Sequence, residues 1–404
     1  MSVIAIFSGL FCNAGAVVQD VIDSTGYRLI TDEAIVATAA ETAGMPVHKV
    51  RRAFSAKTSV FNKFTHEKEC SIACLRLALA QEVQGGRAVV HGFASLLMPR
   101  IGHVLRVCII ADMAYRIERA ATVHGLTEKE TLKRIRERDT DSAAWATIRL
   151  AVADPWDQGL YDMVIPANRV PTAKAGALIE ENLVKDALRR TPASVQAEAD
   201  FVMTATIEMA LSKAGHDVSV VAEKGAVVLT INKQVLMLTR LEEELVAIVK
   251  NIPGVQSVST RVGRDFHQAH IYRKHNFEMP SRVLLVDDER EFVQTLSERL
   301  ELRDMGSAVA YDGESALKLV TEDDPEVMII DLKMPGIDGM EILRQVKATR
   351  PEIEVIVLTG HGSETDRKKC MQLGAFAYLQ KPIDIEALSD ILKKAHEQIR
   401  QHAS

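Results

Sequence analysis

Polar side chains that could do chemistry together follow four short apolar runs near the C-terminus of the chain. They are Asp287, Asp288, Asp331, Thr359 and Lys381. Short apolar runs bounded by turn residues are typical of the buried strands of a parallel sheet. Because ligands of such sheets bind outside the carboxyl ends of the strands, the sequence predicts one site that combines carboxylates, a hydroxyl and an ammonium group.

Strands alternate with amphipathic helices in this part of the sequence. The predicted strands are Arg282–Asp287, Ser307–Tyr311, Val327–Asp331, Glu354–Leu358 and Phe376–Leu379. The predicted helices are Glu289–Leu302, Gly313–Thr321, Gly339–Thr349, Thr365–Leu373 and Ile385–Gln401. This alternation predicts a doubly wound α/β domain with a parallel sheet over residues 280–404.

Four motifs at the ends of these strands resemble the receiver domain of two-component response regulators. They read LLVDDE, IIDLKMPGIDG, VLTGHG and GAFAYLQKPID. The resemblance covers the whole segment and implies a flavodoxin-like (βα)5 fold. It also implies that a partner histidine kinase or a phosphotransfer protein phosphorylates Asp331, whose carboxylate can act as a nucleophile and form an aspartyl phosphate.

The resemblance further implies a magnesium site beside this phosphoacceptor. Asp288 and Asp331 would bind Mg²⁺ directly, together with the backbone carbonyl of Lys333, and Asp287 would help through a water molecule. This ligand set agrees with the preference of Mg²⁺ for a few carboxylates, waters and phosphate oxygens. The alternative is that these acids are solvated loop residues.

Three more residues have roles by the same resemblance. Lys381 would contact the incoming phosphoryl oxygen, which suits a compact ammonium group, and its peptide bond to Pro382 would be cis. Thr359 would donate its hydroxyl to the phosphoryl group, and Tyr378 would rotate inward as a switch. The alternative gives Lys381 only the role of a surface partner for the acids.

The N-terminal residues have the layout of a phosphate-binding loop. The layout consists of a predicted strand, loop and helix, namely Val3–Ser8, Gly9–Gly15 and Ala16–Ser24. Backbone N–H groups of such a loop and the N-terminus of its helix face an anion. However, the P-loop pattern requires a Lys followed by Ser or Thr where this chain has Ala16 and Val17. The candidate residues of a weak phosphate loop are Gly9, Asn13 and Gly15.

Later stretches of this region resemble the cytidylate kinase-like family, a branch of the P-loop nucleoside monophosphate kinases. The stretches are GYRLITDEAI and VCIIADMAYRIERAATVHGLTEKETLKRIRERD. The second contains a capping box, in which Thr127 opens a helix and Glu130 follows three residues later. The resemblance runs from Ile4 to about Ile179 and implies a kinase-like domain over residues 1–191.

The departures from that family fall on residues that would handle phosphate. The family's Gly-Ser-Gly-Gly loop reads Cys12–Gly15 here, its Gly-Arg-Gly reads His91–Phe93, and its Asp-x-x-Arg reads Asp139–Ser142. Losing one cationic donor in a phosphoryl-transfer site costs about 10²–10³ in rate. We therefore expect a kinase fold that has lost its catalytic activity. Such a fold can still bind a nucleotide through backbone amides, Asp32 and the lid arginines. The alternatives are a cytidylate-type kinase regulated by the receiver domain, and an arginine-rich helix face that is only solvated.

Residues 192–279 predict a small α+β domain with the element order α-β-β-α-β. A turn at Glu223–Gly225 joins two strands, and the last strand begins in the run IPGVQSVST. These features resemble the BON domain, which implies a binding surface for lipids or proteins. A basic connector with three histidines follows, which we interpret as a solvated linker rather than a metal site. The histidines are His267, His270 and His275.

The composition of the 404-residue chain argues against several classes of protein. A net charge of −6 indicates no basic stripe of the kind that nucleic-acid binders carry. No apolar run reaches the ~18 residues of a membrane span, and the first basic side chain, Arg28, comes too late for a signal peptide. The five cysteines lack paired CxxC spacing, which favours the reducing cytoplasm. We expect a cytoplasmic response regulator whose N-terminal domains deliver an output without binding DNA; homodimerisation is left open.

Overall fold

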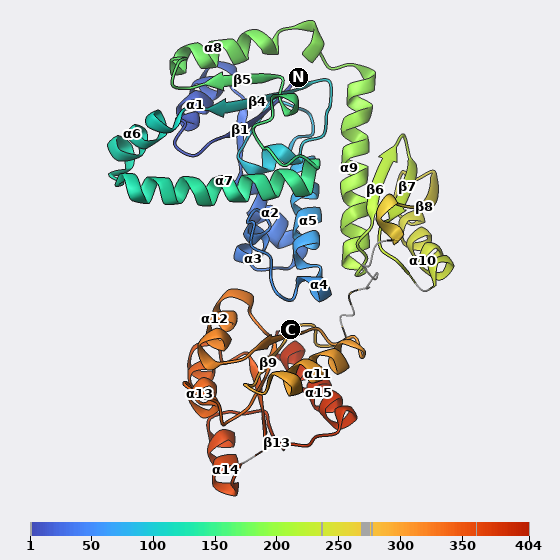
Figure 1. The fold of residues 1–404 in the computed structure, drawn as a ribbon. Helices are drawn as coiled ribbons and strands as arrows, with labels where there is room; N and C mark the ends of the chain where they lie inside the picture. Colours follow the sequence, from blue (N-terminus) through green and yellow to red (C-terminus); the bar gives the residue numbers. More distant parts are fainter. Residues whose placement is uncertain (1, 236, 268–274, 276–277, 361, 404) are drawn as a thin grey trace. The chain divides into compact units, whose positions relative to one another are not determined.

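The computed structural model describes residues 2–235, 237–267, 275, 278–360 and 362–403 (Figure 1). The chain forms two compact units. Unit 1 consists of Met1–Thr58 and Glu67–Tyr272, and unit 2 consists of Ser59–His66 and Arg273–Ser404. The interpretation of the three connector histidines as part of a solvated linker falls partly outside the described residues. His270 and the side chain of His267 are among those left out.

Unit 1 begins with a parallel sheet, to which the described residues contribute five strands. They are β1 (Val3–Ser8), β2 (Arg28–Thr31), β3 (Ala88–His91), β4 (Val104–Ile110) and β5 (Met163–Pro166). Their spatial order is β2-β3-β1-β4-β5, so β1 lies at the centre. Successive side chains of a strand point to opposite faces, and β1 accordingly buries Ile6 on one face and Phe7 on the other.

Helices cover both faces of this sheet (Figure 1). The helices α1 (Ala14–Thr25) and α8 (Thr172–Leu183) pack on the face of Ile6. On the face of Phe7 lie α2 (Asp32–Ala43) and α5 (Glu67–Glu82). The other helical segments before residue 190 in unit 1 are α3 (Val47–Arg52), α6 (Met113–His124), α7 (Glu128–Leu150) and the 3-10 turns Phe93–Leu97, Gln158–Leu160 and Asp186–Leu188.

The predicted capping box of α7 is confirmed, since the Thr127 side chain accepts from the Glu130 backbone and Glu130 bonds back to the N-cap. Two details differ from the prediction. The helix α1 begins at Ala14, two residues before the predicted start, behind a left-handed Asn13. The strand β2 was not predicted, because only one of its four residues is fully buried and its apolar signal is weak.

The rest of unit 1 is a small α+β domain. Its elements are α9 (Pro192–Lys213), β6 (Ser219–Glu223), β7 (Ala226–Ile231), α10 (Leu238–Lys250) and β8 (Ser257–Val262), followed by the 3-10 turn Arg264–His267. This is the predicted order of elements. The central strand β7 runs antiparallel to β6 and parallel to β8. The helix α9 serves both parts of unit 1, because Phe201 packs in the core under the first sheet and Leu211 packs against β6 and β7.

Unit 2 contains the predicted doubly wound α/β domain. Its strands are β9 (Val283–Val286), β10 (Ser307–Ala310), β11 (Val327–Ile330), β12 (Glu354–Thr359) and β13 (Ala377–Gln380). They form a parallel sheet with the order β10-β9-β11-β12-β13 over the described residues. Every residue of β9 and β11 is buried, as expected for central strands that are covered on both faces.

Five helices of unit 2 alternate with these strands within the described residues. They are α11 (Arg290–Glu301), α12 (Gly313–Asp323), α13 (Gly339–Thr349), α14 (Glu364–Gln372) and α15 (Ile385–Ala403). The helices α11 and α15 cover one face of the sheet, and α12, α13 and α14 cover the other. The flavodoxin-like (βα)5 arrangement is thus confirmed. Across the described parts of both units, the helices are too short or too polar to cross a lipid bilayer.

Candidate functional site

The sheet of unit 2 brings four of the predicted site residues to one edge. These residues follow or end β9, β11, β12 and β13, and they are Asp287, Asp331, Thr359 and Lys381. The carboxyl ends of parallel strands lie at the same edge of a sheet, which explains why residues from four separate motifs meet. Asp287, Asp331 and Thr359 are 4%, 6% and 0% exposed. These three side chains are therefore largely shielded from water.

The ammonium group of Lys381 lies between the acids of this edge. Its Nζ donates to Oδ2 of Asp287 at 2.7 Å, to Oδ2 of Asp331 at 3.0 Å and to Oε1 of Glu289 at 3.1 Å. Burial alone would lower the pKa of Lys381, but the hydrogen bonds to Asp287 and Asp331 outweigh burial and raise it above its ordinary value. Lys381 therefore stays charged and compensates two buried carboxylates.

The two buried aspartates differ in acidity. Burial would raise the pKa of Asp331, but hydrogen bonds from Lys381, from the Thr359 hydroxyl and from the Lys333 N–H outweigh it and lower the pKa. In Asp287, burial prevails over the hydrogen bonds from Lys381 and from the Glu289 N–H, and the pKa is raised. Asp331 is thus the carboxylate that is held ionised, which is the state a nucleophile needs.

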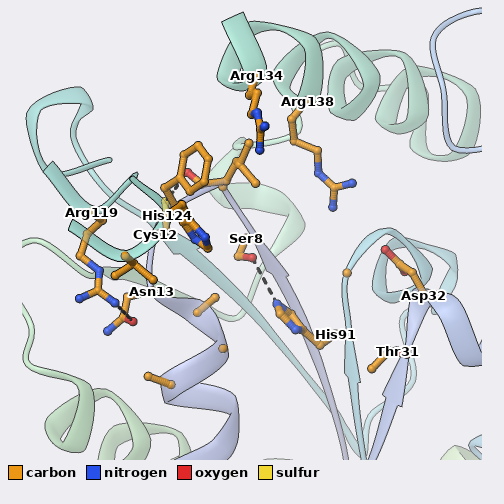
Figure 2. A pocket seen from close by; sticks show the side chains of 18 of the residues that line it. Ser8, Cys12, Asn13, Thr31, Asp32, His91, Arg119, His124, Arg134 and Arg138 are labelled. Atoms are coloured by element: carbon orange, nitrogen blue, oxygen red, sulfur yellow. Dashed lines mark hydrogen bonds between the residues drawn. The ribbon is translucent and has the colours of Figure 1, made fainter. Parts of the chain in front are cut away.

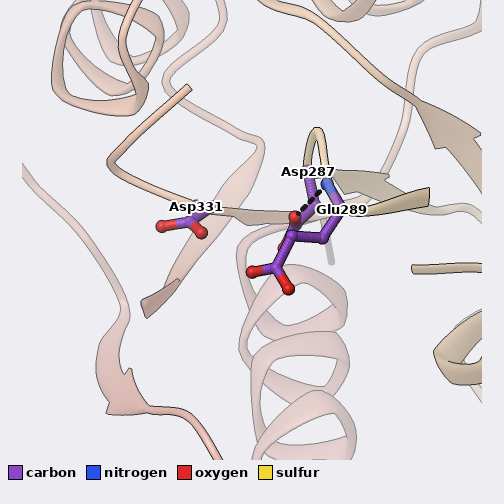
Figure 3. A group of neighbouring side chains, drawn as sticks. All are labelled: Asp287, Glu289 and Asp331. Carbon is purple, nitrogen blue, oxygen red and sulfur yellow. Dashed lines mark hydrogen bonds between the residues drawn. The ribbon is translucent and has the colours of Figure 1, made fainter. Parts of the chain in front are cut away.

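Three carboxylates form a group that can hold a metal ion (Figure 3). Oxygens of Asp287, Glu289 and Asp331 all lie within 4.8 Å of one another. Sequence reasoning missed Glu289, although an acid directly after two aspartates in LLVDDE was a usable signal. Asp288 is exposed, as Glu289 is, and does not belong to this group of three, so its predicted role as a direct ligand stays a prediction. Hard oxygen donors in this number suit Mg²⁺.

Thr359 and Tyr378 lie on neighbouring strands next to Asp331. A Cβ atom on Gly362 would lie 1.5 Å from the hydroxyl oxygen of Tyr378 and 3.0 Å from Cγ2 of Thr359. The Tyr378 ring is therefore turned inward, toward Thr359, into space that a side chain at position 362 would occupy. Burial raises the pKa of Tyr378. The peptide bond before Pro382 is cis, as the resemblance implied.

The predicted phosphate loop lines a cavity of about 640 Å³ in unit 1 (Figure 2). All three candidate residues line it, namely Gly9, Asn13 and Gly15. Three arginines of α6 and α7 also line it, namely Arg119, Arg134 and Arg138. Figure 2 shows Arg134 and Arg138 extending from α7 above the loop, and Arg119 beside Asn13. The cavity therefore combines a backbone loop with cationic side chains.

Two arginines hold this loop in its conformation. Nε of Arg116 donates to the carbonyl oxygen of Leu10 at 2.9 Å, and Arg119 donates to Oδ1 of Asn13 at 2.6 Å. The amide nitrogen of Asn13 in turn donates to Oγ1 of Thr172 at 3.1 Å. Both ends of the Asn13 side chain are thus engaged within the protein. An anion in this cavity would meet loop backbone and arginines rather than this side chain.

Asp32 supports a turn in this cavity wall. Its carboxylate accepts from the backbone N–H groups of Phe93 at 2.9 Å and Ala94 at 2.8 Å. A Cβ atom on Gly92 would lie only 2.3 Å from Oδ2 of Asp32, so the turn requires glycine, which also has a positive φ of 117°. Burial raises the pKa of Asp32 despite these hydrogen bonds. The carboxylate of Asp32, which was predicted to contact a nucleotide, therefore also stabilises the turn after β3.

Two family models match separate parts of this chain. Residues 283–393 match the response regulator receiver domain, and residues 3–169 match the cytidylate kinase-like family. The chain therefore contains a C-terminal receiver domain and an N-terminal cytidylate kinase-like domain, as the motifs predicted.

Individual relatives cover shorter stretches. Response regulator MprA of Mycolicibacterium vanbaalenii is 36% identical over 110 residues, which are 27% of this chain and 48% of that protein. The C4-dicarboxylate transport transcriptional regulatory protein DctD of Pseudomonas aeruginosa is 36% identical over 121 residues, which are 30% of this chain and 26% of that protein. This chain thus spans less than half the length of either relative. A solved receiver domain protein of Clostridium thermocellum has 35% identity and a TM-score of 0.29, covering 30% of this chain and 96% of that one.

Proposed function

We propose that this protein is a two-component response regulator, which receives a phosphoryl group on Asp331 from a histidine kinase or a phosphotransfer protein. The observation that carries the proposal is the position of Lys381, whose Nζ lies 3.0 Å from Oδ2 of Asp331 and 2.7 Å from Oδ2 of Asp287. A cation held between two buried acids compensates their charge before transfer. It is also placed to meet an oxygen of a phosphoryl group that arrives on Asp331.

In the proposed transfer, a carboxylate oxygen of Asp331 attacks the phosphorus atom of a phosphohistidine on the partner. A P–O bond forms, the P–N bond breaks, and the imidazole leaves with the electron pair of that bond. The lowered pKa of Asp331 favours its ionised, nucleophilic form. Lys381 and Thr359 would contact the transferred phosphoryl oxygens, because both already hydrogen-bond to Asp331.

The carboxylates of the site fit a Mg²⁺ ion. Asp287, Glu289 and Asp331 offer oxygens within 4.8 Å of one another, and the receiver resemblance adds Asp288 and the backbone carbonyl of Lys333. Bound there, Mg²⁺ would neutralise negative charge on the phosphoryl group.

Phosphorylation of the full-length protein by acetyl phosphate and Mg²⁺ tests this function. We expect a phosphorylated species on a phosphate-affinity gel for the wild type and none for Asp331→Asn. The matched control is Asp338→Asn, because Asp338 is a nearby helix N-cap and Asn is also a good N-cap; it should be phosphorylated normally. Beryllofluoride, which mimics the phosphoryl group, should bind wild type but not Asp331→Asn. Equal phosphorylation of wild type and Asp331→Asn rejects the proposal.

We propose that the response is delivered in the cytoplasm by the domains at residues 1–191 and 192–279, without contact to DNA. The net charge of −6 supports an output other than nucleic-acid binding. The small domain is proposed to be BON-like and to provide a binding surface. Val221 on β6 and Val262 on β8 are 55% and 48% exposed, which is consistent with such a surface.

A second candidate function is nucleotide binding at the cavity of unit 1, without phosphoryl transfer. Binding is supported by Arg119, Arg134 and Arg138, which line this cavity. The absence of phosphoryl transfer is supported by the described lining, which includes no lysine. Calorimetry with CMP, dCMP and ATP tests binding in the wild type and in Arg134→Met, which should bind more weakly. A coupled assay for transfer from ATP to CMP, with and without beryllofluoride, should show no turnover. Turnover above background would instead identify a nucleoside monophosphate kinase regulated by the receiver, and no binding of any nucleotide rejects this candidate.

A further inference from the structure

A segment from the N-terminal part of the sequence is built into unit 2. Ser59–His66 lies between α3 and α5 in the chain, and its helix is α4 (Asn62–Thr65). Phe61 is 0% exposed and belongs to the same apolar cluster as Leu284 of β9 and Met328 of β11. The match to the receiver family begins only at residue 283. The segment is therefore an addition to the matched receiver domain.

This segment lies at the amino-terminal edge of the receiver sheet. A Cβ atom on Gly306, the residue before β10, would lie 2.7 Å from Cγ of Phe64. The same Cβ would lie 2.2 Å from the carbonyl oxygen of Ser281, which precedes β9. Asp331 follows the opposite, carboxyl end of β11. Since the sheet is parallel, the segment and the proposed phosphorylation site occupy opposite edges of it.

Two polar contacts accompany the buried ring. Nζ of Lys63 lies 2.6 Å from Oε1 of Glu301, at the end of α11. Nδ1 of His275 lies 2.8 Å from the carbonyl oxygen of Phe64. A carbonyl oxygen only accepts, so Nδ1 of His275 carries the proton of this hydrogen bond; burial lowers the pKa of His275. The contacts fix the direction in which the short helix meets the receiver.

We infer that residues 59–66 are an internal docking segment for the amino-terminal edge of the receiver domain. The occupant of this surface is part of the same molecule, and its anchor is the ring of Phe61. Aromatic side chains in fully desolvated positions are typical anchors of this kind, with charged contacts at the rim adding orientation. The carboxyl edge, where Asp331 lies, is left to phosphoryl donors.

The chain just before the docking segment lines a second cavity of unit 1. This cavity has a volume of about 370 Å³, and its lining includes Arg51, Arg52, Phe54 and Ser55. Only a few residues separate Ser55 from Phe61 in the chain. The chain therefore runs from a stretch that lines this cavity of unit 1 directly into the docking segment of unit 2.

The test is to cut the full-length protein in that connector and ask whether the fragments stay together. A protease recognition sequence is inserted between Phe266 and Glu278, and the cleaved protein is analysed by size-exclusion chromatography with light scattering. Internal docking predicts co-elution at the mass of one chain. Separate elution of the wild-type fragments overturns the inference. Co-elution at the mass of two chains also overturns it, because the segment would then bind a second copy.

Two substitutions on adjacent residues identify the anchor. Phe61→Asp places a carboxylate among buried apolar side chains, which is strongly unfavourable, so its fragments should separate. Val60 is 42% exposed, so Val60→Asp is the matched control and its fragments should stay together. Equal behaviour of the two variants contradicts an anchor at Phe61.

A charge reversal tests docking without disturbing the buried cluster. The side chains of Lys63 and Glu301 are 61% and 26% exposed, so Lys63→Glu should leave both units folded. It should raise the dissociation constant of the fragments about 1.5- to 5-fold, the range of an exposed ion pair. Adding Glu301→Lys should restore the affinity. An unchanged affinity in the single variant, or no recovery in the double variant, would contradict this placement of α4.

Discussion

The hydroxyl oxygen of Tyr378 occupies the space that a side chain at Gly362 would need. A Cβ atom added to Gly362 would lie only 1.5 Å from this oxygen. This hydroxyl is buried and has no hydrogen-bond partner among the described residues. An inward Tyr378 and a side chain at position 362 therefore exclude each other. The glycine at the end of the motif VLTGHG consequently has a steric role: it makes room for the tyrosine of the next strand.

Gly362→Ala should turn Tyr378 outward, because the far end of the tyrosine is the group that can move away from the new methyl. The measurement is ¹⁹F NMR of the fluorotyrosine-labelled protein, with the resonance assigned through Tyr378→Phe. We expect the Tyr378 resonance to shift toward that of exposed tyrosine. Gly360→Ala is the matched control, since nothing lies within 4 Å of a Cβ there, and it should cause no shift. A resonance that is the same in both variants would contradict the steric role.

Lys381→Met should destabilise the receiver, because it leaves Asp287 and Asp331 buried without their cation. Removing one partner from a buried ion pair costs about 3–5 kcal/mol. Without Lys381 the pKa of Asp331 should rise above its unfolded value of about 3.9. A group whose folded pKa is raised loses stability as the pH increases through that pKa. The loss should therefore be larger at pH 7 than at pH 4.

Hydrogen exchange of peptides from β9 and β11, in the presence of a chelator, measures this loss within the full-length protein. The matched control is Lys368→Met, because Lys368 is exposed on α14, and it should leave exchange unchanged. Equal protection of the wild type and Lys381→Met at pH 7 would show that the acids do not depend on this cation.

The metal site gives a direct comparison between two neighbouring acids. Oxygens of Glu289 group with those of Asp287 and Asp331, whereas the receiver resemblance assigns a ligand role to Asp288. We expect Glu289→Gln and Asp288→Asn each to weaken Mg²⁺ binding by about 10-fold or more, as loss of a supporting or direct ligand does. Isothermal calorimetry of the full-length protein measures both. An unchanged affinity in either variant removes that residue from the ligand set.

Asp32→Ala should destabilise the kinase-like domain, because it leaves the N–H groups of Phe93 and Ala94 without their acceptor. An unsatisfied buried donor costs about 1–3 kcal/mol. Nε1 of Trp145 donates to the carbonyl oxygen of Phe93 at 3.0 Å, so tryptophan fluorescence reports on this turn during thermal unfolding. Glu33→Ala is the matched control, since Glu33 is exposed. Equal melting of the two variants would mean that Asp32 does not hold the turn.

The receiver domain was predictable because its signals are local. Each strand is a short apolar run, and the polar residue that ends it belongs to the same motif, as with Asp331 after Ile330. Parallel pairing then brings the ends together without any further information. The same reasoning missed Glu289: the run of three acids in LLVDDE signals an acidic site, but it does not show which of the three side chains come together in space.

The features that sequence reasoning missed depend on contacts between distant residues. Phe61 gave no signal of its place in the receiver core, since a single aromatic residue before a short helix forms no periodic pattern. The role of Asp32 in nucleotide binding stays a prediction, but its hydrogen bonds from the backbone N–H groups of Phe93 and Ala94 were missed. A carboxylate that supports a turn and one that binds a ligand look identical in a sequence.

The place of Phe61 also has a consequence for the time course of synthesis. The ribosome makes Phe61 before the larger part of unit 1, Glu67–Tyr272, whereas Leu284 and Met328, which share its cluster, are made after unit 1. The ring cannot join the receiver core during that interval, because the strands that form this core have not yet been made. Closing so long a loop adds an entropic barrier that local helices do not face. The receiver should accordingly reach its final packing later than the sheet of unit 1 does.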